Sequence, residues 1–256
     1  MARIFISGSA DGLGLMAGEW LLERGHAVTF HARSETRADD LKRRLKSDSA
    51  VVIGDVSTIA AMRKVADGVN RIGAHDAVIH NVAIGYQEPR RQETGDGPSK
   101  LFAVNTLAPY LLTALIEKPR RLIYLSSGLH QSGKPDVSDL QWTARRWNGM
   151  QAYSDSKLQD CWIAFAMARR WSDVMSNALE PGWVATKMGG PGAPDDLAKG
   201  AETQAWLAVS DDAAATVSGE YFFHRKPKAV SPNARRIDLQ DALMDACRKI
   251  TGVAIA

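Results

Sequence analysis

The chain has 256 residues, of which 45% are hydrophobic and 24% charged, values that suit a single globular α/β domain with a buried core. A net charge of only +3 and the lack of a long apolar run argue against a nucleic-acid partner, a membrane-surface partner and a membrane-spanning role. Two cysteines without a CxxC pair argue against a disulfide framework or a metal site, and they fit a reducing, cytoplasmic compartment.

Short β-rich runs alternate along the chain with longer amphipathic runs. Strands are expected at 4–7, 27–30, 51–53, 77–80, 122–126 and 174–179, and helices at 13–24, 36–46, 59–71, 99–116 and 151–171. The later strands are continuously apolar, as in sheets that are covered on both faces. This alternation predicts an α/β fold with a doubly wound parallel sheet, the Rossmann fold, in a single domain over residues 1–256.

Three long loops, at about 86–98, 128–149 and 188–194, follow the fourth, fifth and sixth expected strands. They leave the carboxyl edge of the sheet, where ligands bind in such folds, so we expect them to shape a substrate site. The middle loop carries Trp142 and Trp147 beside two arginines, which could line a pocket for a flat or anionic substrate or could pack on the domain as a surface insertion. The glycine- and proline-rich third loop suits either a lid or a disordered segment.

The turn between the first expected strand and the first expected helix is rich in glycine, with Gly8, Gly12 and Gly14. Glycine allows a tight turn and lets the backbone approach a pyrophosphate, and the helix N-terminus offers free N–H groups and partial positive charge. A glycine-rich turn alone is weak evidence. Its place between a strand and a helix nevertheless predicts a dinucleotide site, which includes Ser9 and Leu13 of the same turn.

The end of the second expected strand indicates which dinucleotide binds. Residues 30–34 contain no carboxylate that could accept a hydrogen bond from the ribose 2′-hydroxyl of NAD. Arg33 could instead bind the 2′-phosphate of NADP through a charge-assisted fork, with Arg37 and Ser9 as helpers. The alternative is that Arg33 is a solvated loop residue. We therefore expect NADP, with NAD as the second choice.

Tyr153 and Lys157 lie four residues apart in an expected helix, so they share one face. A free phenol has a pKa of about 10, and an ammonium about 4 Å away could lower that pKa by up to ~3 units at an effective dielectric of 20. Such spacing is also frequent by chance. The pair predicts a tyrosine that exchanges a proton with a substrate oxygen.

Two further polar residues could complete such a site. Ser127, at the end of the fifth expected strand, could donate a hydrogen bond to the substrate oxygen, whereas Ser126 could point into the sheet. Asn105 interrupts an otherwise apolar helix. It is either a core residue with satisfied hydrogen bonds or the holder of a relay water that reaches Lys157.

Taken in order, these motifs resemble those of the short-chain dehydrogenase/reductase superfamily, over essentially the whole chain. The resemblance implies a catalytic tetrad of Asn105, Ser127, Tyr153 and Lys157. It implies further cofactor contacts beyond the glycine turn: Asp55 and Val56 at the adenine ring, Asn81 and Ala83 near the adenosine ribose, and Pro181, Gly182, Val184 and Thr186 at the nicotinamide end. The late segment 218–222 is similar to a strand of the retinol-dehydrogenase-like branch, although no membrane anchor is expected here and a retinoid substrate is not implied.

The chain departs from the family pattern after the fourth expected strand, where the usual Asn-Asn-Ala-Gly reads His80-Asn81-Val82-Ala83. The extra methyl of Ala83 could alter cofactor affinity. The resemblance implies an NADP(H)-dependent oxidoreductase that acts on an alcohol, aldehyde or ketone, with Tyr153 as the proton donor or acceptor. The alternative is a non-catalytic NADP(H)-binding sensor or scaffold protein. A homodimer or homotetramer is expected, because the helices at 99–116 and 151–171 carry apolar residues on more than one side.

Overall fold

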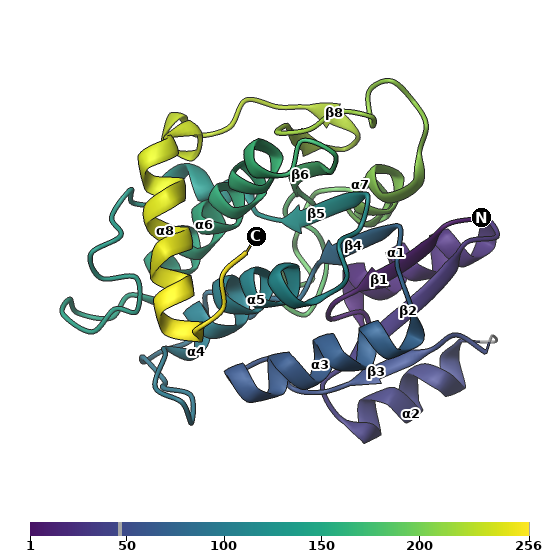
Figure 1. The fold of residues 1–256 in the computed structure, drawn as a ribbon, viewed down its shortest axis with the longest axis horizontal. Coiled ribbons are helices and arrows are strands. Elements are labelled where there is room, and N and C mark those ends of the chain that lie inside the picture. Colours follow the sequence, from purple (N-terminus) through teal and green to yellow (C-terminus); the bar gives the residue numbers. More distant parts are fainter. Residues whose placement is uncertain (46–47, 256) are drawn as a thin grey trace.

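The computed structural model describes residues 1–45 and 48–255 and centres on an eight-stranded sheet (Figure 1). The strand order is β3-β2-β1-β4-β5-β6-β7-β8, and every neighbouring pair is parallel except β7 with β8. The strands are β1 (Arg3–Ile6), β2 (Ala27–Ala32), β3 (Val51–Ile53), β4 (Ala77–His80), β5 (Arg121–Leu125), β6 (Met175–Glu180), β7 (Tyr221–Phe223) and β8 (Lys226–Pro227). The order reverses between β1 and β4, which is where doubly wound sheets form their ligand crevice.

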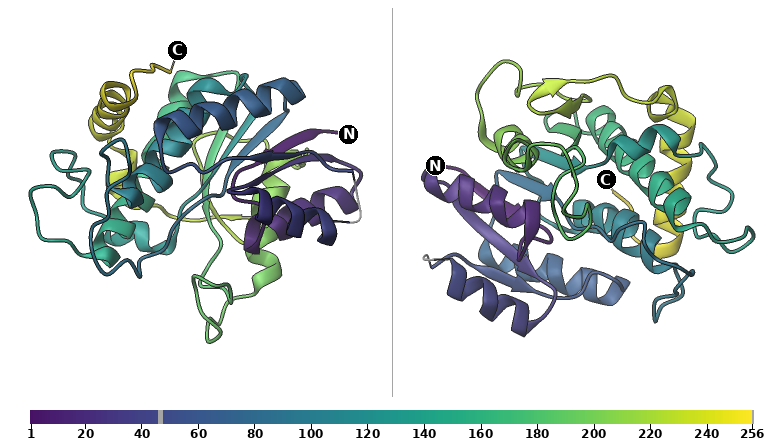
Figure 2. Two further views of the ribbon diagram at one scale, coloured as in Figure 1. Left: turned by 90° about the horizontal axis from the view of Figure 1, so that it is seen from below. Right: turned by 180° about the vertical axis from the view of Figure 1, so that it is seen from behind.

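Helices cover both faces of the sheet (Figure 2). One face carries α1 (Gly12–Glu23), α2 (Glu35–Arg44) and α7 (Leu197–Val209). The other carries α3 (Ile59–Ile72), the run α4 (Lys100–Phe102), η1 (Ala103–Leu107) and α5 (Ala108–Leu115), then α6 (Gly149–Arg170) and α8 (Ile237–Thr251). Two short 3₁₀ turns, η2 (Gly128–Ser132) and η3 (Pro232–Arg235), complete the fold. This three-layer arrangement is the doubly wound fold that the sequence predicts.

Alternation within the strands divides the core into two layers. Along β1, Phe5 packs with the α3–α5–α6–α8 layer, while Ile4 and Ile6 pack with the α1–α2–α7 layer. All three side chains are fully buried. A strand that is covered on both faces must be apolar at every position, and this explains why these strands read as continuous apolar runs.

Polar side chains at the N-termini fix where several helices begin. Asp11, Ser34, Thr58, Asn148 and Asp196 each precede a helix and accept a hydrogen bond from a backbone N–H of its first turn. Such caps satisfy groups that have no partner within the helix, and each contributes about 1 kcal/mol. Because Asp11 and Asn148 start the helices that carry the glycine turn and Tyr153, these caps also fix the position of the candidate site.

The expected strands and helices agree with the structure to within one or two residues, with three differences. The expected helix 36–46 ends at Arg44, and Lys46 lies outside the described residues. The expected helix 99–116 contains the π-helical turn η1. The C-terminal elements α7, β8 and α8 were not predicted, and β7 was expected only through the resemblance of segment 218–222.

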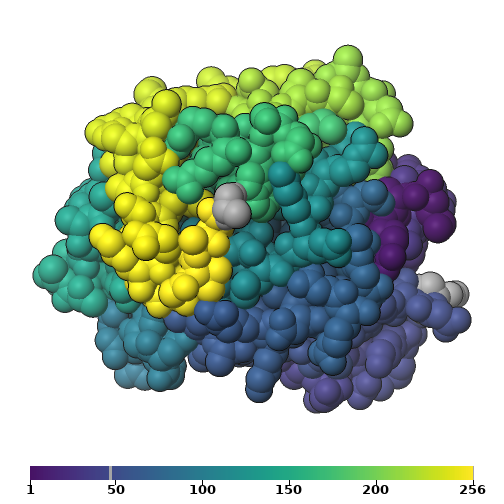
Figure 3. Space-filling view, in the orientation of Figure 1, coloured from purple at the N-terminus to yellow at the C-terminus, as the bar shows by residue number. Residues whose placement is uncertain are grey.

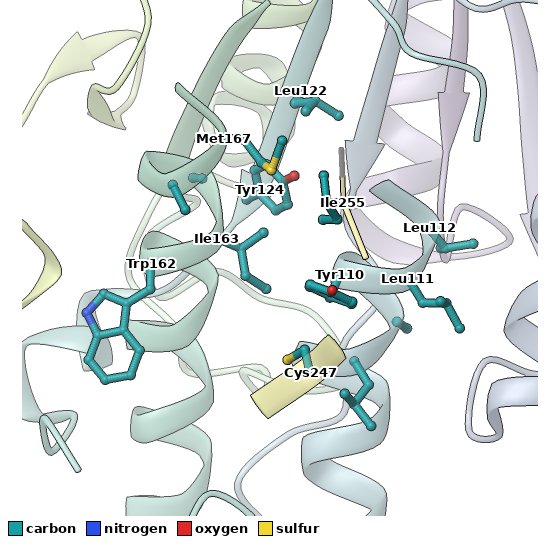
Figure 4. Close-up of a cluster of buried hydrophobic side chains, with 14 of the residues drawn as sticks. Tyr110, Leu111, Leu112, Leu122, Tyr124, Trp162, Ile163, Met167, Cys247 and Ile255 are labelled. Atoms are coloured by element: carbon teal, nitrogen blue, oxygen red, sulfur yellow. The ribbon is translucent and has the colours of Figure 1, made fainter. Parts of the chain in front are cut away.

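The C-terminal helix α8 and the segment after it lie over α5 and α6 (Figure 3). Tyr110, Ile163, Cys247 and Ile255 meet between these elements, and the Tyr110 hydroxyl donates to the Val253 carbonyl at 2.7 Å (Figure 4). The apolar faces that suggested a dimer are therefore buried within one chain. The homodimer or homotetramer stays a prediction, but excess exposed apolar surface on these helices no longer supports it.

Some global features bear on the class of site. Among residues 1–45 and 48–255, no helix is both long and apolar enough to cross a bilayer. No cluster of three or more His, Cys, Asp or Glu side chains that could hold a metal ion occurs in these same ranges. Cys161 and Cys247 are both buried and free, and burial raises the pKa of the Cys161 thiol to about 12.

Candidate active site

The glycine turn forms a close-packed cradle at the end of β1. Gly8 and Gly12 have φ of +65° and +55°, a conformation that side-chain-bearing residues rarely adopt. A Cβ on Gly8 would lie 2.8 Å from the Cα of Val82, and one on Gly14 would lie 2.5 Å from Nδ2 of Asn81. The turn can therefore pack this closely against Asn81 and Val82 only because Gly8 and Gly14 carry no side chain.

A cavity of about 510 Å³ opens in front of this cradle, at the switch point of the sheet. Asn81 stabilises the glycine turn, because its Nδ2 donates to the carbonyls of Ser7 and Gly8 at 3.1 and 3.0 Å. Two ammonium groups, those of Lys157 and Lys187, lie among the lining residues. The full lining is Gly8, Asp11, Gly12, Leu13, Met16, Asn81, Val82, Ala83, Leu125, Ser126, Tyr153, Lys157, Pro181, Ala185, Thr186, Lys187, Met188 and Leu197.

Asp11 connects three parts of the chain across this cavity. It caps α1, accepts from Arg37 Nη2 at 3.1 Å and forms a close ion pair with Lys187 in the segment after β6. The hydrogen bond from Lys187 is the main cause that lowers the pKa of Asp11 to about 2, against the opposing effect of burial. Arg37 and Lys187 thus both pair with Asp11 beside the glycine turn.

Seven predicted cofactor residues do not line this cavity: Ser9, Gly14, Arg33, Asp55, Val56, Gly182 and Val184, of which Gly182 and Val184 line the adjoining cavity. Ser9 is fully buried; its hydroxyl donates to the Ile6 carbonyl and accepts from the N–H of His31, both at 2.8 Å. The hydroxyl thus ties β1 to β2, and the expected role of Ser9 as a phosphate helper stays a prediction. Arg33 is exposed just beyond β2, while Asp55 is exposed and Val56 belongs to the core, so their cofactor contacts stay predictions.

A second cavity of about 490 Å³ adjoins the first. Aromatic and apolar side chains dominate its lining. The lining residues are Leu13, Tyr86, Ser126, Ser127, Gly128, Leu129, Met150, Tyr153, Glu180, Pro181, Gly182, Trp183, Val184, Thr186, Met188, Gly189, Asp195, Phe223 and Lys228. Tyr153 belongs to both linings, so it stands in the wall between the two cavities.

Tyr153 is held in this wall by aromatic neighbours. Its ring is only 6% exposed, and it meets Tyr86 edge-on with centroids 5.7 Å apart. The Lys157 ammonium lies 5.7 Å from the centroid of the Tyr153 ring. Burial raises the pKa of Tyr153, and this effect outweighs the lowering by Lys157 and by the hydrogen bond with Ser127. Lys157 therefore lowers this pKa in the expected direction, but desolvation is the larger effect, so the pKa is raised overall.

Lys157 makes two hydrogen bonds within the protein and also lines the first cavity. Its Nζ donates to the Leu125 carbonyl and to Oδ2 of Asp160, both at 2.8 Å. Both side chains of the Lys157–Asp160 pair are only 3% exposed. Burial lowers the pKa of Lys157, but the charge of Asp160 and the nearby Tyr153 outweigh it and raise the pKa overall.

The π-helical turn η1 aims Asn105 at the loop that follows β4. A π turn inserts one residue into a helix and often marks a functional position. The amide of Asn105 accepts from the N–H of Ile84 at 2.8 Å and donates to the Ile84 carbonyl and to Ser156 Oγ, at 3.0 and 3.1 Å. Because both amide hydrogens are used within the chain, the structure favours the satisfied core residue over the side-chain relay.

The two serines at the end of β5 have different surroundings. Ser126 Oγ donates to the Lys157 carbonyl at 2.7 Å, which ties the strand to α6. Ser127 caps η2 by accepting from the N–H of Leu129 at 3.2 Å, and it lines the second cavity. Ser127, Tyr153 and Lys157 therefore meet at one place, as the sequence predicts, and Ser126 serves the framework.

The loop 128–149 shapes the site from outside. Trp142 is 6% exposed and packs in the small cluster that contains Tyr153, while the Arg145 guanidinium lies 3.7 Å from the Trp142 ring centroid. Arg145 is also paired with Asp139 and Asp155. Neither tryptophan of this loop lines a cavity, so the structure favours a packed surface insertion over a pocket for an anionic substrate.

Several residues of the second cavity were missed by the sequence analysis. Glu180 ends β6 with a buried carboxylate that forms a close ion pair with Lys228, which follows β8. A Cβ on Gly128 would lie 2.5 Å from Oε2 of Glu180, so glycine there makes room for the acid. Phe223 and Trp183 add apolar surface from other segments. The acid directly before Pro181-Gly182 was the available signal for Glu180, whereas nothing local marks Phe223 or Lys228.

Comparison with known proteins places this geometry in context. Residues 8–218 match a family model described as enoyl-(acyl carrier protein) reductase. The chain is 39% identical over 259 residues to an uncharacterized oxidoreductase of Emericella nidulans and to the short-chain dehydrogenase chyC of Penicillium rubens; each alignment covers 100% of this chain and 99% of the relative. Human retinol dehydrogenase 13 is 27% identical over 287 residues, which cover 98% of this chain and 84% of that protein. The expected likeness to the retinol-dehydrogenase-like branch is confirmed.

Solved structures share the fold. A crystal structure of an uncharacterized protein from Mycobacterium paratuberculosis superposes with a TM-score of 0.87 at 24% identity, over 100% of this chain and 95% of that one. A gluconate 5-dehydrogenase from Burkholderia cenocepacia, solved with NADP and tartrate, gives a TM-score of 0.65 at 20% identity, over 87% of this chain and 92% of that one. At such identities these likenesses establish the fold.

Proposed function

This chain belongs to the short-chain dehydrogenase/reductase family of oxidoreductases, and on that premise we propose that it transfers a hydride between NADP(H) and the carbonyl or alcohol carbon of a small molecule. Tyr153 is the proton donor or acceptor in this proposal. The observation that carries it is the place of Tyr153 in the wall shared by the two adjacent cavities. One cavity would hold the cofactor, and the other would hold the compound to be reduced or oxidised.

The residues of the first cavity fit a dinucleotide. A Cβ on Gly8 or Gly14 would collide with Val82 or Asn81 and displace the turn, and the N-terminus of α1 begins at this turn. Lys187, which pairs with Asp11 beside the glycine turn, supplies positive charge where a diphosphate would lie. Pro181 and Thr186 border both cavities, as suits the nicotinamide end. When bound, the nicotinamide supplies the hydride chemistry, and the protein supplies alignment and electrostatics.

The proton is handled by the residues around Tyr153. Ser127 orients the substrate oxygen by a hydrogen bond and stabilises the charge that develops on it. Tyr153 then donates its phenolic proton to that oxygen in reduction or accepts a proton from it in oxidation. Lys157 lowers the pKa of Tyr153 from its buried value and binds the cofactor ribose. Asn105 holds the Ile84 backbone and Ser156, which keeps the loop after β4 against α6.

Preference for NADP over NAD is proposed from the charges around the adenosine end. Arg33 is exposed beyond β2, and Arg37 and Lys187 converge on Asp11 nearby. No carboxylate ends β2. The gluconate 5-dehydrogenase with the same fold was solved with NADP, which agrees with this preference. Replacement of Arg33 by Ala should weaken NADPH binding about tenfold and leave NADH binding unchanged, and Arg43→Ala on the exposed face of α2 is the control.

The lining of the second cavity supports an apolar, ring-bearing aldehyde or ketone, or the matching alcohol. Tyr86, Met150, Trp183 and Phe223 line it and offer aromatic and apolar surface to such a ring. Glu180 and Lys228 neutralise each other in the wall of this cavity, so the pair adds no net charge.

The homodimer or homotetramer is a separate proposal. Because α8 covers the helices that were expected to pair, light scattering at micromolar protein provides its test.

The direct experiment mixes the protein with NADPH and a panel of aldehydes, ketones and quinones while the loss of NADPH absorbance is followed. Turnover of at least one apolar carbonyl compound is expected. The second candidate, a sensor or scaffold, keeps the cradle but needs no tyrosine in the wall between two cavities. Tight NADPH binding without turnover of any compound on a broad panel would overturn the enzymatic proposal in favour of the sensor.

A further inference from the structure

The ammonium of Lys157 has a buried carboxylate as its partner. Asp160 lies one turn further along α6, and its Oδ2 accepts from Nζ of Lys157 at 2.8 Å. Each side chain is 3% exposed, so the pair is shielded from solvent. Coulomb interactions are several times stronger in such surroundings than in water. The negative charge of Asp160 therefore offsets the effect of the Lys157 charge on neighbouring groups.

The pair fixes where the ammonium can reach. A lysine ammonium has three N–H bonds. Two of them are directed to the Leu125 carbonyl and to Asp160, and Lys157 also lines the cofactor cavity. One N–H therefore remains for the ligand in that cavity. Asp160 itself lines neither cavity, so it acts through Lys157 and is a positioning residue.

The groups that face this pair come from several elements. Next to the pair itself are Tyr153 and Cys161 of α6 and Tyr124 of β5. Around Tyr153 and Cys161 are Tyr86 from the loop after β4, Glu180 of β6 and Tyr221 of β7. Tyr124 is linked through Thr113 to His80, a histidine that is buried and whose pKa falls to about 3. His80 is therefore neutral at physiological pH, and Cys161 is held as a thiol. In that range Lys157, Asp160 and the more distant, Lys228-paired Glu180 carry the charges near Tyr153.

We propose that Asp160 sets the pH at which Tyr153 gives up its proton: its carboxylate balances the charge of Lys157 and so extends the protonated, proton-donating form of Tyr153 to higher pH. The inference rests on the proton-transfer role proposed for Tyr153. A protonated phenol can deliver a proton to a carbonyl oxygen, so carbonyl reduction should persist to higher pH than it would without Asp160. Alcohol oxidation accordingly requires higher pH.

The pKa directions agree with this arrangement. Burial is the largest cause that raises the pKa of Tyr153, and Asp160 adds to it while Lys157 opposes it. Burial also raises the pKa of Asp160 itself, to about 6, with Lys157 opposing. Asp160 is therefore ionised at neutral pH and becomes protonated in mild acid, which frees the charge of Lys157 to act on Tyr153.

The test is Asp160→Asn, which keeps an oxygen acceptor for Lys157 and removes the charge. The Tyr153 phenol is titrated in cofactor-free protein by carbon NMR of labelled tyrosine, with the signal assigned by its loss in Tyr153→Phe. The tyrosine signal should move at a pH about one unit lower in the variant. In turnover assays, the rise of alcohol oxidation with pH should shift down by the same amount. Asp160→Ser is the second neutral variant and should give the same direction of shift.

The matched control is Asp155→Asn, which removes another buried carboxylate of α6. Asp155 faces Arg145 and the N–H of Lys134 on the opposite side of the helix, so neither readout should change. An unchanged or upward titration of Tyr153 in both Asp160 variants would overturn the inference. This result is distinguishable from failure of the proposed function, because NMR reads Tyr153 without turnover, whereas a wild-type protein that reduces no carbonyl compound contradicts only the enzymatic proposal.

Discussion

The two adjacent cavities differ in how far backbone and side chains line them. The proposed cofactor cavity is bounded on one side by backbone, namely the glycines at the end of β1 and the N-terminus of α1, which the side chain of Asn81 holds in place. The substrate cavity is framed by side chains from segments far apart in the chain, such as Tyr86, Met150 and Phe223. The first should therefore be sensitive to any added Cβ, and the second should tolerate changes of shape while changing what it binds. Tyr153 belongs to both.

The largest effect on turnover is expected at Tyr153, in the wall that the two cavities share. Tyr153→Phe removes the hydroxyl and keeps the ring that packs on Tyr86. Turnover should fall about 10²- to 10⁴-fold, the usual contribution of a general acid. NADPH affinity, measured by fluorescence titration, should stay within about twofold, because the cradle is untouched. Turnover equal to that of the unmodified protein would exclude the role of Tyr153.

Buried histidines should make the whole fold, and with it both cavities, less stable in acid. Burial lowers the pKa of His80 to about 3, and burial also lowers that of His75 to about 4. The unfolded chain binds protons on these residues below about pH 6.5 while the folded chain does not, so their contribution to stability is full above pH 6.5 and is lost as pH falls. At pH 5 each should cost about 2 kcal/mol in the free energy of unfolding.

Urea unfolding followed at pH 7 and pH 5 measures this loss. His80→Gln removes one of the titrating groups, so the difference between the two pH values should shrink by about 2 kcal/mol. A difference that stays the same in the variant would show that His80 is not protonated on unfolding. If cofactor binding were lost at a higher pH than the fold, the two cavities would not be lost together, against this prediction.

The backbone origin of the cofactor cavity is tested by adding one methyl group. Gly8→Ala places a Cβ at 2.8 Å from Val82, whereas Gly25→Ala meets nothing within 4 Å. Both glycines have positive φ, so both variants carry a similar backbone strain of about 1 kcal/mol. NADPH affinity should fall about tenfold or more in Gly8→Ala and stay unchanged in Gly25→Ala. Equal affinities in the two variants would contradict the close-packed cradle.

The smallest effect is expected in the substrate cavity. Phe223→Ala removes apolar contact surface, so the KM for an apolar carbonyl substrate should rise about threefold to tenfold while NADPH affinity is retained. Ile237→Ala, which changes an exposed residue at the start of α8, is the control. A loss of NADPH affinity in Phe223→Ala would mean that the two cavities are not separate.

The contrast between the cavities also explains what the sequence could predict. The order of strands and helices, the glycine turn and the meeting of Ser127, Tyr153 and Lys157 follow from local patterns, because each motif directly follows a strand or repeats along a helix. Glu180, Phe223 and Lys228 could not be placed, since only the three-dimensional fold brings them together. The ion pair of Asp160 was missed for a different reason: its spacing from Lys157 is local, but its burial depends on the packing of α6 against the sheet and α8.

The central claim is that one phenol faces both cavities. A crystal structure with NADP and a bound carbonyl compound tests it most directly. We predict the nicotinamide in the cavity of Lys157, the carbonyl compound in that of Phe223, and one carbonyl oxygen that accepts hydrogen bonds from both Tyr153 and Ser127. A compound bound with its carbonyl oxygen away from Tyr153, or a dinucleotide bound outside the glycine cradle, would contradict the account.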